Sequence, residues 1–406
     1  MLVLNNMVEE KYDLVMLLMS TQRAWEGGIN NRNLQILNQL RHHPNIRNIL
    51  TIDFLPQTYY RALARGGRDI FPGWLDKRTI SRGPFSNLKQ INPHEWNATS
   101  IMPVISPRIF WQTIKSNLKA LGFNQNKLIT WSYDPLNPEF FDQWPESFKV
   151  FDAVDNWAAH QSHIKRAEKL MDNYRAIGEK ANVVFMVNES LSALFPKTKN
   201  AVAIYNGVDN NFFAEKSKIM PRELLDVKRP IIGYIGILEA RVDTDLLMEI
   251  IKKNLDKTIA IIGGTLSRMP WQKKNFKISS LKKFKNVVLC GRVPYNEMNL
   301  FVHSFDAAIV PHKITALTKS MDPMKIYEYL AAGKPVVTTS VVDPKKFKGL
   351  IYSAKNNEEF ILMIKEALTK DNNELRAKRQ ELAKHFSWAN RFAEMMRHIP
   401  ILNSKF

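Results

Sequence analysis

The sequence of 406 residues has a single cysteine, Cys290, and no apolar run long enough to cross a bilayer. One cysteine cannot form an intrachain disulfide or a thiolate zinc site, which excludes a disulfide scaffold and a structural zinc domain. Acidic residues are also scarce, since 39 Asp and Glu residues stand against 58 Lys and Arg residues and leave a net charge of +19. We therefore expect anionic partners, whether nucleotides, nucleic acid or phospholipid headgroups.

Hydrophobic residues make up 45% of the chain and charged residues 24%, which is the composition of a folded globular protein. The length is sufficient for two domains, each with its own core. The first residues, MLVLNNMVEEKYD, are acidic where a secretory signal would be basic. We expect a cytoplasmic protein of two domains in a reducing compartment.

Apolar runs of strand length alternate with helical patterns in two successive series. The first series predicts strands at 12–20, 127–133, 149–154, 183–187 and 201–205, with helices at 30–41, 110–121 and 162–180. The second predicts strands at 230–238, 258–263, 286–289, 307–311 and 335–340, with helices at 244–253, 279–284, 295–305 and 323–332 and two closing helical segments. Strands joined through helices form parallel sheets, which predicts an α/β fold of two doubly wound domains with ligands at the carboxyl ends of the strands.

The segment Pro56–Pro107 does not follow this alternation. It interleaves aromatic and basic side chains, namely Tyr59, Tyr60, Phe71 and Trp74 with Arg61, Arg65, Arg68, Lys77, Arg78 and Arg82. A long insertion of this kind is either functional or a solvated loop with a small aromatic cluster of its own. The sequence leaves both interpretations open.

The most specific motif is DPMKIYEYLAAGKPVV at 322–337, where Gly333 ends a helix that carries Glu328 just before a buried strand. This motif resembles the nucleotide-binding signature of GT-B glycosyltransferases, a group related to glycogen synthases and polysaccharide-assembly enzymes. The resemblance implies that Glu328 binds ribose hydroxyls, because a carboxylate offers only acceptors and can take both hydroxyls of a diol. A surface glutamate on an amphipathic helix is the alternative.

Other short motifs follow in the order of the same family. GYIGIL at 233–238 resembles the turn that places a glycine, here Gly236, near the donor diphosphate, and the segment that begins with Arg292 and Val293 resembles the one that lines the base. The interdomain NGVD at 206–209 and HFSW at 385–388 resemble two further family motifs. The resemblance implies a GT-B fold of two Rossmann-like domains that face a central cleft. An acceptor-binding domain at 1–207, completed by a helix at 386–406, and a donor-binding domain at 208–385 are expected.

Two departures from the family pattern concern charged residues. The first carboxylate of the usual Glu-x7-Glu motif falls at Ser320, so the contact to the donor sugar is missing or is made by a neighbour such as Asp322. The arginine that often follows the second glycine is Ile237, so another cation must neutralise the diphosphate.

Lys325 is the first candidate for this cation. With Met324 it opens the helix of Glu328, and a helix N-terminus also attracts phosphate oxygens. Arg241, just after the preceding strand, is the second candidate. Either cation could instead be a solvated side chain with no specific role.

Two N-terminal motifs complete the predicted site. Glu26, Gly27 and Gly28 follow the first strand, where glycines let backbone amides approach a phosphate or sugar, although a tight turn explains them as well. Asp155, in FDAVDNW, stands where many GT-B enzymes have a histidine. An aspartate at this position resembles the pattern of the subgroup that includes teichuronic-acid and xanthan-type glycosyltransferases. Asp155 is the candidate catalytic base or stabiliser of charge on the donor sugar, with a helix cap as the alternative.

No histidine, cysteine or carboxylate spacing predicts a metal site. Asp243 and Asp245 begin a helix and are read as N-terminal capping residues. GT-B enzymes generally work without a metal, because protein cations and helix dipoles stabilise the leaving diphosphate. We expect no cofactor and no metal.

The expected function is that of a hexosyltransferase of class EC 2.4, which moves a sugar from a nucleoside-diphosphate sugar to a lipid-linked or polysaccharide acceptor in cell-envelope synthesis. Peripheral contact with the anionic cytoplasmic face of the inner membrane is expected from the charge and the aromatic-basic insertion. One alternative is a sugar-nucleotide epimerase of the same fold. The other is a basic nucleic-acid-binding protein, which rests on the acid-free stretch 266–293 and lacks any recognisable reading module.

Overall fold

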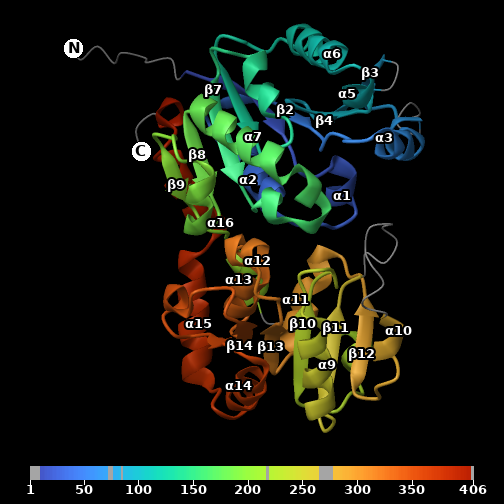
Figure 1. Ribbon diagram of the computed structural model, residues 1–406, viewed down its shortest axis with the longest axis vertical. Helices are drawn as coiled ribbons and strands as arrows, with labels where there is room; N and C mark the ends of the chain where they lie inside the picture. The colour runs from blue at the N-terminus through green and yellow to red at the C-terminus, as the bar shows by residue number, and fades with distance from the viewer. Residues whose placement is uncertain (1–9, 72–75, 84–85, 216–218, 265–277, 404–406) are drawn as a thin grey trace, which may run out of the picture. The chain divides into compact units, whose positions relative to one another are not determined.

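The structure, a computed structural model, describes residues 10–71, 76–83, 86–215, 219–264 and 278–403. Its contacts divide the chain into two units that can be followed in Figure 1. The N-terminal unit comprises residues 1–158, 166–204 and 392–406, and the C-terminal unit comprises residues 159–165 and 205–391. The chain changes unit after Ile204 and returns at Phe392.

The N-terminal unit is built on a nine-stranded sheet of order β3-β4-β5-β2-β1-β6-β7-β8-β9. Its strands are β1 (Tyr12–Leu17), β2 (Ile46–Ile52), β3 (Thr79–Gly83), β4 (Ser86–Asn92), β5 (Glu95–Ser100), β6 (Leu128–Ser132), β7 (Phe148–Ala153), β8 (Val183–Met186) and β9 (Ala201–Ala203). Its helices are α1 (Gln22–Glu26), α2 (Arg32–Arg41), α3 (Tyr59–Arg65), α5 (Met102–Ile105), α6 (Pro107–Ala120), α7 (Ala167–Lys180) and most of α16 (Trp388–Met396). Because side chains alternate along a strand, Val15 and Leu17 of β1 pack with α6 and α7, while Leu14 and Met16 are buried on the opposite face.

The segment Pro56–Pro107 is not the loop that the sequence allowed. It forms α3, the one-turn π-helix η1 (Gly66–Ile70) and the strands β3, β4 and β5. β5 pairs parallel with β2, and β4 pairs antiparallel with both β5 and β3, so the segment extends the sheet. Pairing with neighbouring strands satisfies the backbone N–H and C=O groups of this polar stretch. The periodicity of the residues within the stretch does not reveal this pairing.

A buried ion pair connects three elements of the N-terminal unit. Nε of Arg32, at the start of α2, lies 2.9 Å from both carboxylate oxygens of Asp152 in β7. The same guanidinium donates to the carbonyl of Ile204, where the chain leaves the unit, and contacts the sulfur of Met395 in α16. Removing either charged partner would leave the other buried and uncompensated, which costs about 3–5 kcal/mol.

The C-terminal unit contains a parallel sheet of six strands in the order β12-β11-β10-β13-β14-β15. The strands are β10 (Ile231–Ile235), β11 (Thr258–Ile262), β12 (Val287–Gly291), β13 (Ala307–Val310), β14 (Val336–Thr339) and β15 (Tyr352–Ala354). The helices are α8 (Asn210–Ala214), α9 (Thr244–Lys253), α10 (Ile278–Leu281), α11 (Met298–Ser304), α12 (Ala316–Ser320), α13 (Met324–Ala331), α14 (Asn357–Thr369) and α15 (Asn373–His385). The structure therefore confirms the predicted α/β fold of two doubly wound sheets.

Both faces of the C-terminal sheet are covered by helices. Ile231 and Ile235 of β10 pack with apolar residues of α8, α11, α13 and α15, whereas Ile232 and Tyr234 pack with α9, α10 and α14. This burial on both faces explains why PIIGYIGIL reads as a continuous apolar run.

Three features differ from the predicted elements. The strands β2 and β15 were not predicted, and the helix expected at 162–180 consists of the 3₁₀ segment η4 (Gln161–Arg166) followed by α7. Three helices, α14, α15 and α16, close the chain where two were expected. Within the described ranges, no helix combines the length and apolarity that crossing a membrane requires.

Candidate functional site

The strand order of the C-terminal sheet reverses between β10 and β13. Ligands of doubly wound sheets bind outside the carboxyl ends of the strands at such a switch point. Here these ends are followed by Gly236, after β10, and by Pro311 and His312, after β13. Residues that bind the donor are therefore expected close to this edge.

Glycines bring three strand ends close together at this edge. A Cβ on Gly263, after β11, would lie 2.1 Å from the carbonyl oxygen of Gly236, and both glycines have positive φ. The amide of Gly263 donates to the carbonyl of Gly291 at the end of β12. Only glycine permits this approach at position 263. Gly291 opened the predicted base-lining motif, but neither Gly291 nor Gly263 was selected as a site residue.

Lys325 lies directly over the glycine that follows β10. A Cβ on Gly236 would meet its Nζ at 2.6 Å. Nζ donates to the hydroxyl of Tyr234 at 3.3 Å and stands 4.4 Å from the centre of that ring. Burial and the charge of Arg241 lower the pKa of Lys325 to about 7, so the ammonium has lost hydration without gaining an ion pair among the described residues.

Glu328 follows one turn later on α13 and is 8% exposed. Its carboxylate has no hydrogen-bond or ion-pair partner in the part of the chain that the structure describes. Burial raises the pKa of Glu328 to about 7, against the opposing effect of Lys325. A carboxylate in this state is ready to accept hydrogen bonds from a ligand, and it is not the surface glutamate of the alternative interpretation.

The N-terminus of α13 adds further unpaired donors. Pro323 precedes the helix and provides no side-chain cap, so the amides of Met324 and Lys325 remain without a capping partner in the described structure. The amides and the helix dipole favour an anion at this position. The prediction that Lys325 acts together with the helix end is thus consistent with the local geometry.

Two more nitrogen-bearing side chains lie near Lys325. Arg241 pairs with Glu239, but its buried Nε has no partner among the described residues. His312 is 2% exposed, and neither of its ring nitrogens has a partner there. The sequence analysis did not select His312, although its place right after a strand at the switch point was a usable signal.

Arg292 and Val293 lie at the end of β12. The side chain of Arg292 passes 3.3 Å from a Cβ placed on Gly264, and Val293 packs against the core formed with α11 and α13. The base-lining role of both residues stays a prediction. Residues 266–277 of the basic stretch 266–293 lie outside the described residues, and the nucleic-acid role of the stretch stays a prediction.

Asp322 does not take over the missing sugar contact. Its carboxylate accepts the amide of Asn206 at 2.6 Å and the hydroxyl of Tyr327 at 2.7 Å, and it pairs with Nζ of Lys346 at 2.7 Å. The hydroxyl of Ser320 donates to the carbonyl of Leu317. The linker, α13 and Lys346 already provide partners for its oxygens, which favours the alternative that the sugar contact is missing.

The NGVD and HFSW motifs bind each other within the C-terminal unit. Val208 forms a parallel bridge with Ser387, and its amide donates to the carbonyl of Phe386. A Cβ on Gly207 would lie 2.9 Å from that carbonyl oxygen and from the ring of Trp388, which explains the glycine. The two chain segments that leave this unit thus lie side by side.

In the N-terminal unit, the glycine motif forms a turn. The amide of Gly27 donates to the carbonyl of Arg23, and the amide of Gly28, at φ +83°, donates to Trp25. Since both amides are used, they cannot also donate to a phosphate, and the tight-turn alternative is favoured. Glu26 pairs with Lys89 of β4 at 3.2 Å, and its acceptor-side role stays a prediction.

Asp155 lies in the loop after β7 and is half-buried. Its carbonyl accepts the hydroxyl of Tyr174, which in turn accepts the amide of Trp157. Tyr174 therefore holds the backbone of this loop against α7. Asp134, which follows β6, is a fully buried carboxyl whose pKa burial raises to about 7, but its oxygens bind Leu136 and Asn137 and close a local turn.

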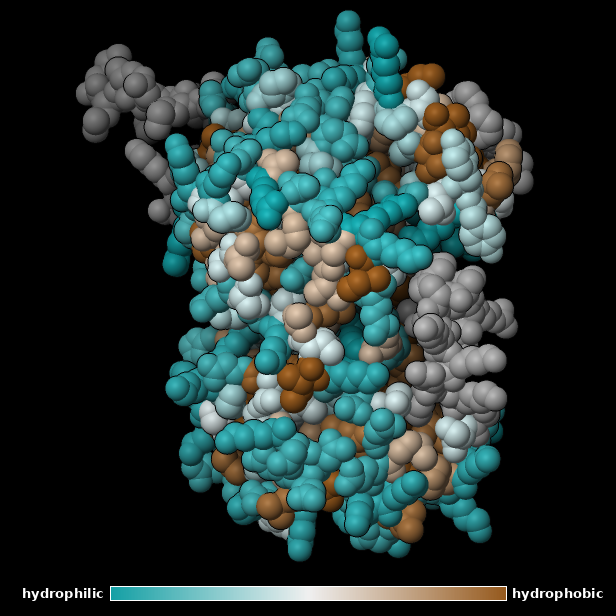
Figure 2. Space-filling model, in the orientation of Figure 1, coloured by the Kyte–Doolittle hydropathy of each residue, from teal (hydrophilic) through white to brown (hydrophobic). Residues whose placement is uncertain are grey.

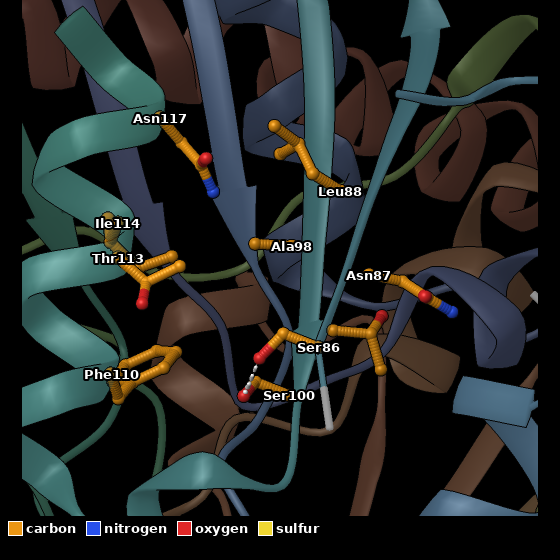
Figure 3. Close-up of a pocket in the computed structure, with 10 residues that line it drawn as sticks. Ser86, Asn87, Leu88, Ala98, Ser100, Phe110, Thr113, Ile114 and Asn117 are labelled. Carbon is orange, nitrogen blue, oxygen red and sulfur yellow. Dashed lines mark hydrogen bonds between the residues drawn. The ribbon is translucent and has the colours of Figure 1, made fainter. Parts of the chain in front are cut away.

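A small cavity lies between β4, β5 and α6 (Figure 3). Ser86 and Ser100 hydrogen-bond to each other at its end, and Leu88, Phe110 and Ile114 line it. Its volume of about 20 Å³ accommodates a single water molecule, so it is too small for a substrate.

Among the residues described by the structure, no cluster of three or more His, Cys, Asp or Glu side chains could hold a metal ion. Asp243 caps α9 by accepting the amides of Asp245 and Leu246, as the sequence indicated.

Comparison with known proteins agrees with this geometry. Residues 229–370 match the family model of glycosyl transferases group 1. Over 302 residues, 70% of this chain and 75% of the other, the sequence is 23% identical to TuaH of Bacillus subtilis, a protein named as a teichuronic acid biosynthesis glycosyltransferase.

Two solved structures share the fold over nearly the full length. Sucrose-phosphate synthase of Thermosynechococcus elongatus superposes with a TM-score of 0.67 at 13% identity, covering 97% of this chain and 99% of the other. Anabaena HepE in complex with UDP and glucose gives 0.62 at 12% identity, covering 96% and 99%. The resemblance seen in the motifs is thereby confirmed, and the fold is GT-B.

Replacing Lys325 by Met should stabilise the free protein. Lys325 is charged in the unfolded chain up to its ordinary pKa of 10.5, whereas its folded pKa is about 7. Below pH 7 the folded state carries the full cost of the buried charge, and this cost disappears as the pH rises toward 10.5. Lys325→Met should therefore raise the unfolding free energy by about 2–5 kcal/mol at pH 6.5 and by clearly less at pH 9.5.

Urea unfolding at both pH values measures this difference. Lys365→Met, at an exposed position of α14, is the control and should change stability little. Equal effects of the two substitutions would show that Lys325 is not held in a destabilising position.

Proposed function

We propose that this chain is a GT-B glycosyltransferase of the group 1 type, which moves a hexosyl group from a nucleoside-diphosphate sugar to a lipid-linked or polysaccharide acceptor. The product would belong to a cell-envelope or exported polysaccharide. The observation that carries the proposal is the pair Lys325 and Glu328, two buried charged groups without ion-pair partners among the described residues, on the helix that begins at the switch point. A nucleoside diphosphate carries the complementary groups, anionic phosphates for Lys325 and a ribose diol for Glu328.

The donor is assigned to the C-terminal unit. Lys325, Arg241 and the free amides at the start of α13 stabilise the diphosphate, which is the leaving group of the transfer. HepE, a structural neighbour, binds UDP and glucose, which supports a sugar nucleotide of this class. With these cations in place, the reaction is proposed to need neither a metal nor another cofactor.

The acceptor is assigned to the N-terminal unit, with Asp155 as the base that takes the proton of the acceptor hydroxyl or as the stabiliser of charge on the donor sugar. The relative TuaH is named for teichuronic acid synthesis, which supports a cell-envelope glycan as the acceptor. A sugar-nucleotide epimerase of the same fold remains the alternative. Turnover of donor without acceptor would favour it, whereas steeply salt-dependent oligonucleotide binding without nucleotide-sugar binding would favour a nucleic-acid-binding protein.

The N-terminal unit also offers a surface for a membrane. Tyr59, Tyr60 and Leu63 of α3 are 68%, 74% and 74% exposed, and hydrophobic side chains reach the surface over α3 and α5 in Figure 2. This apolar surface, together with the net charge of +19, supports peripheral binding to the cytoplasmic face of the inner membrane, where a lipid-linked acceptor lies.

The basic residues of the insertion contribute less to this surface than the sequence suggested. Arg65 is buried and donates to the carbonyl of Phe54, and Arg68 is paired with Asp69. Trp74 lies outside the described residues. We therefore assign most of the membrane affinity to the exposed aromatic and aliphatic side chains.

Donor binding should depend on pH around neutrality. Below pH 7 Glu328 takes up a proton and loses acceptor capacity, and above pH 7 Lys325 loses its charge, so diphosphate affinity should be highest near pH 7.

Glu328→Ala should weaken nucleotide binding by about 1–3 kcal/mol, and Lys325→Ala should weaken the binding of diphosphates more than that of the nucleoside. Calorimetry across a panel of nucleosides, nucleoside diphosphates and their sugars tests this. Glu358→Ala, on the exposed side of α14, is the control, and unchanged affinity in both site variants would reject the donor site.

Asp155→Asn should preserve the fold and the donor affinity while lowering turnover by roughly 100-fold or more, because the amide can neither accept a proton nor balance a positive charge. Steady-state transfer to a glycan or lipid-linked acceptor measures the change. Near-normal turnover would return Asp155 to the role of a helix cap.

Membrane binding should depend on the exposed face of α3. The double variant Tyr60→Ser and Leu63→Ser should reduce co-sedimentation with anionic vesicles by about tenfold or more, because it removes the two most exposed apolar side chains of α3. Leu255→Ser, at a leucine that is 66% exposed in the C-terminal unit, is the matched control. If the double variant sediments like the unaltered protein, the proposed surface is wrong, whereas equal binding to neutral and anionic vesicles would show that the net charge contributes nothing.

A further inference from the structure

His312 occupies a fixed position at the switch point of the C-terminal sheet. It follows β13 directly, and β13 is the strand that lies next to β10 where the order reverses. Its backbone is held from two sides, by an antiparallel bridge to Val242 and by the hydroxyl of Thr339, which donates to its carbonyl at 2.7 Å. The ring is therefore attached to a rigid part of the edge where ligands of this fold class bind.

The ring carries an unused hydrogen-bonding capacity. It is 2% exposed, and neither Nδ1 nor Nε2 has a partner among the described residues. An unsatisfied buried polar atom costs about 1–3 kcal/mol, so a residue present for packing alone would be apolar at this position. The two vacant nitrogens point to a ligand that supplies their partners.

The surroundings of the ring determine which ligand atoms fit. Burial and the charges of Lys325, from α13, and Arg241, from the segment after β10, lower the pKa of His312 well below its ordinary value. Glu239 pairs with Arg241, and the charges of both residues also act on the pKa of His160. The imidazole is neutral, with one N–H donor and one acceptor nitrogen.

Two hydroxyl groups of a sugar can satisfy both nitrogens, since one can accept from the ring N–H while the other donates to the bare nitrogen. Phosphate oxygens of an ionised diphosphate only accept, so they would leave one ring nitrogen unpaired. The diphosphate already has Lys325, Arg241 and the helix amides. The sugar, by contrast, lacks the carboxylate contact of the family pattern, because Ser320 stands at that position and both oxygens of Asp322 already have partners.

We propose that His312 binds hydroxyl groups of the sugar carried by the nucleotide donor and thereby selects the donor sugar. This inference rests on the proposed transfer from a nucleoside-diphosphate sugar. It predicts that His312 matters for the sugar nucleotide and not for the nucleoside diphosphate alone.

The test compares two ligands on two variants. His312→Leu keeps an apolar side chain without hydrogen bonds, and His312→Asn keeps one donor and one acceptor that cannot titrate. Affinities for UDP, GDP, ADP and dTDP and for their glucose derivatives are measured by calorimetry, and the pair that the unaltered protein binds best is used. His385→Asn, at an exposed histidine of α15, is the control.

The expected result is a loss of at least tenfold in affinity for the sugar nucleotide in His312→Leu, partial recovery in His312→Asn, and nucleoside-diphosphate affinity within twofold of the unaltered protein. Retained diphosphate binding also shows that the variants fold. Equal weakening of both ligands, loss of diphosphate binding in both variants, or no change in either ligand would overturn the assignment. If the unaltered protein binds none of the diphosphates, the proposed transfer itself fails, which separates that outcome from a failure of His312 alone.

Discussion

The binding edge of the C-terminal unit depends on the hydrogen bonds and the ion pair of the Asp322 carboxylate. This carboxylate receives the amide of Asn206 from the linker, the hydroxyl of Tyr327 from α13 and the ammonium of Lys346. A buried carboxylate is stable only with such partners, so the start of α13 cannot move without leaving a charge uncompensated. Because α13 carries Lys325 and Glu328, this contact determines where both charged groups lie.

Around this saturated carboxylate, the same edge holds polar groups whose capacity is not used. Lys325 and Glu328 have pKa values shifted toward 7 from opposite sides, and His312 is neutral with two vacant nitrogens. Each lowers the stability of the free protein, and a ligand with phosphates and hydroxyls restores the missing partners. Such a trade between stability and binding is the usual cost of a preorganised site.

Most elements and the donor motif could be predicted because their signals are local. The helix of Glu328 combines helical spacing with a terminating glycine, and strands such as β10 and β11 appear as continuous apolar runs. The strands of the insertion were not predicted, because β4 and β5 are stabilised by pairing with each other and, through β5, with β2, which lies far away in the sequence. For Gly27 and Gly28 the sequence left a phosphate or sugar contact and a tight turn open, and in the structure their amides donate to carbonyls of the preceding turn.

The sequence by itself determined the α/β class, the order of the GT-B motifs and the helix that carries Lys325 and Glu328, since spacing along the chain encodes all three. Only the tertiary structure decided which polar groups are satisfied. Asn206 and Asp322 are 116 residues apart, and Arg32 and Asp152 are 120 apart, yet each pair is buried and bonded. A hydrogen-bond partner can come from any part of the chain, so whether Asp322 is saturated and His312 is vacant depends on which distant residues the fold brings together.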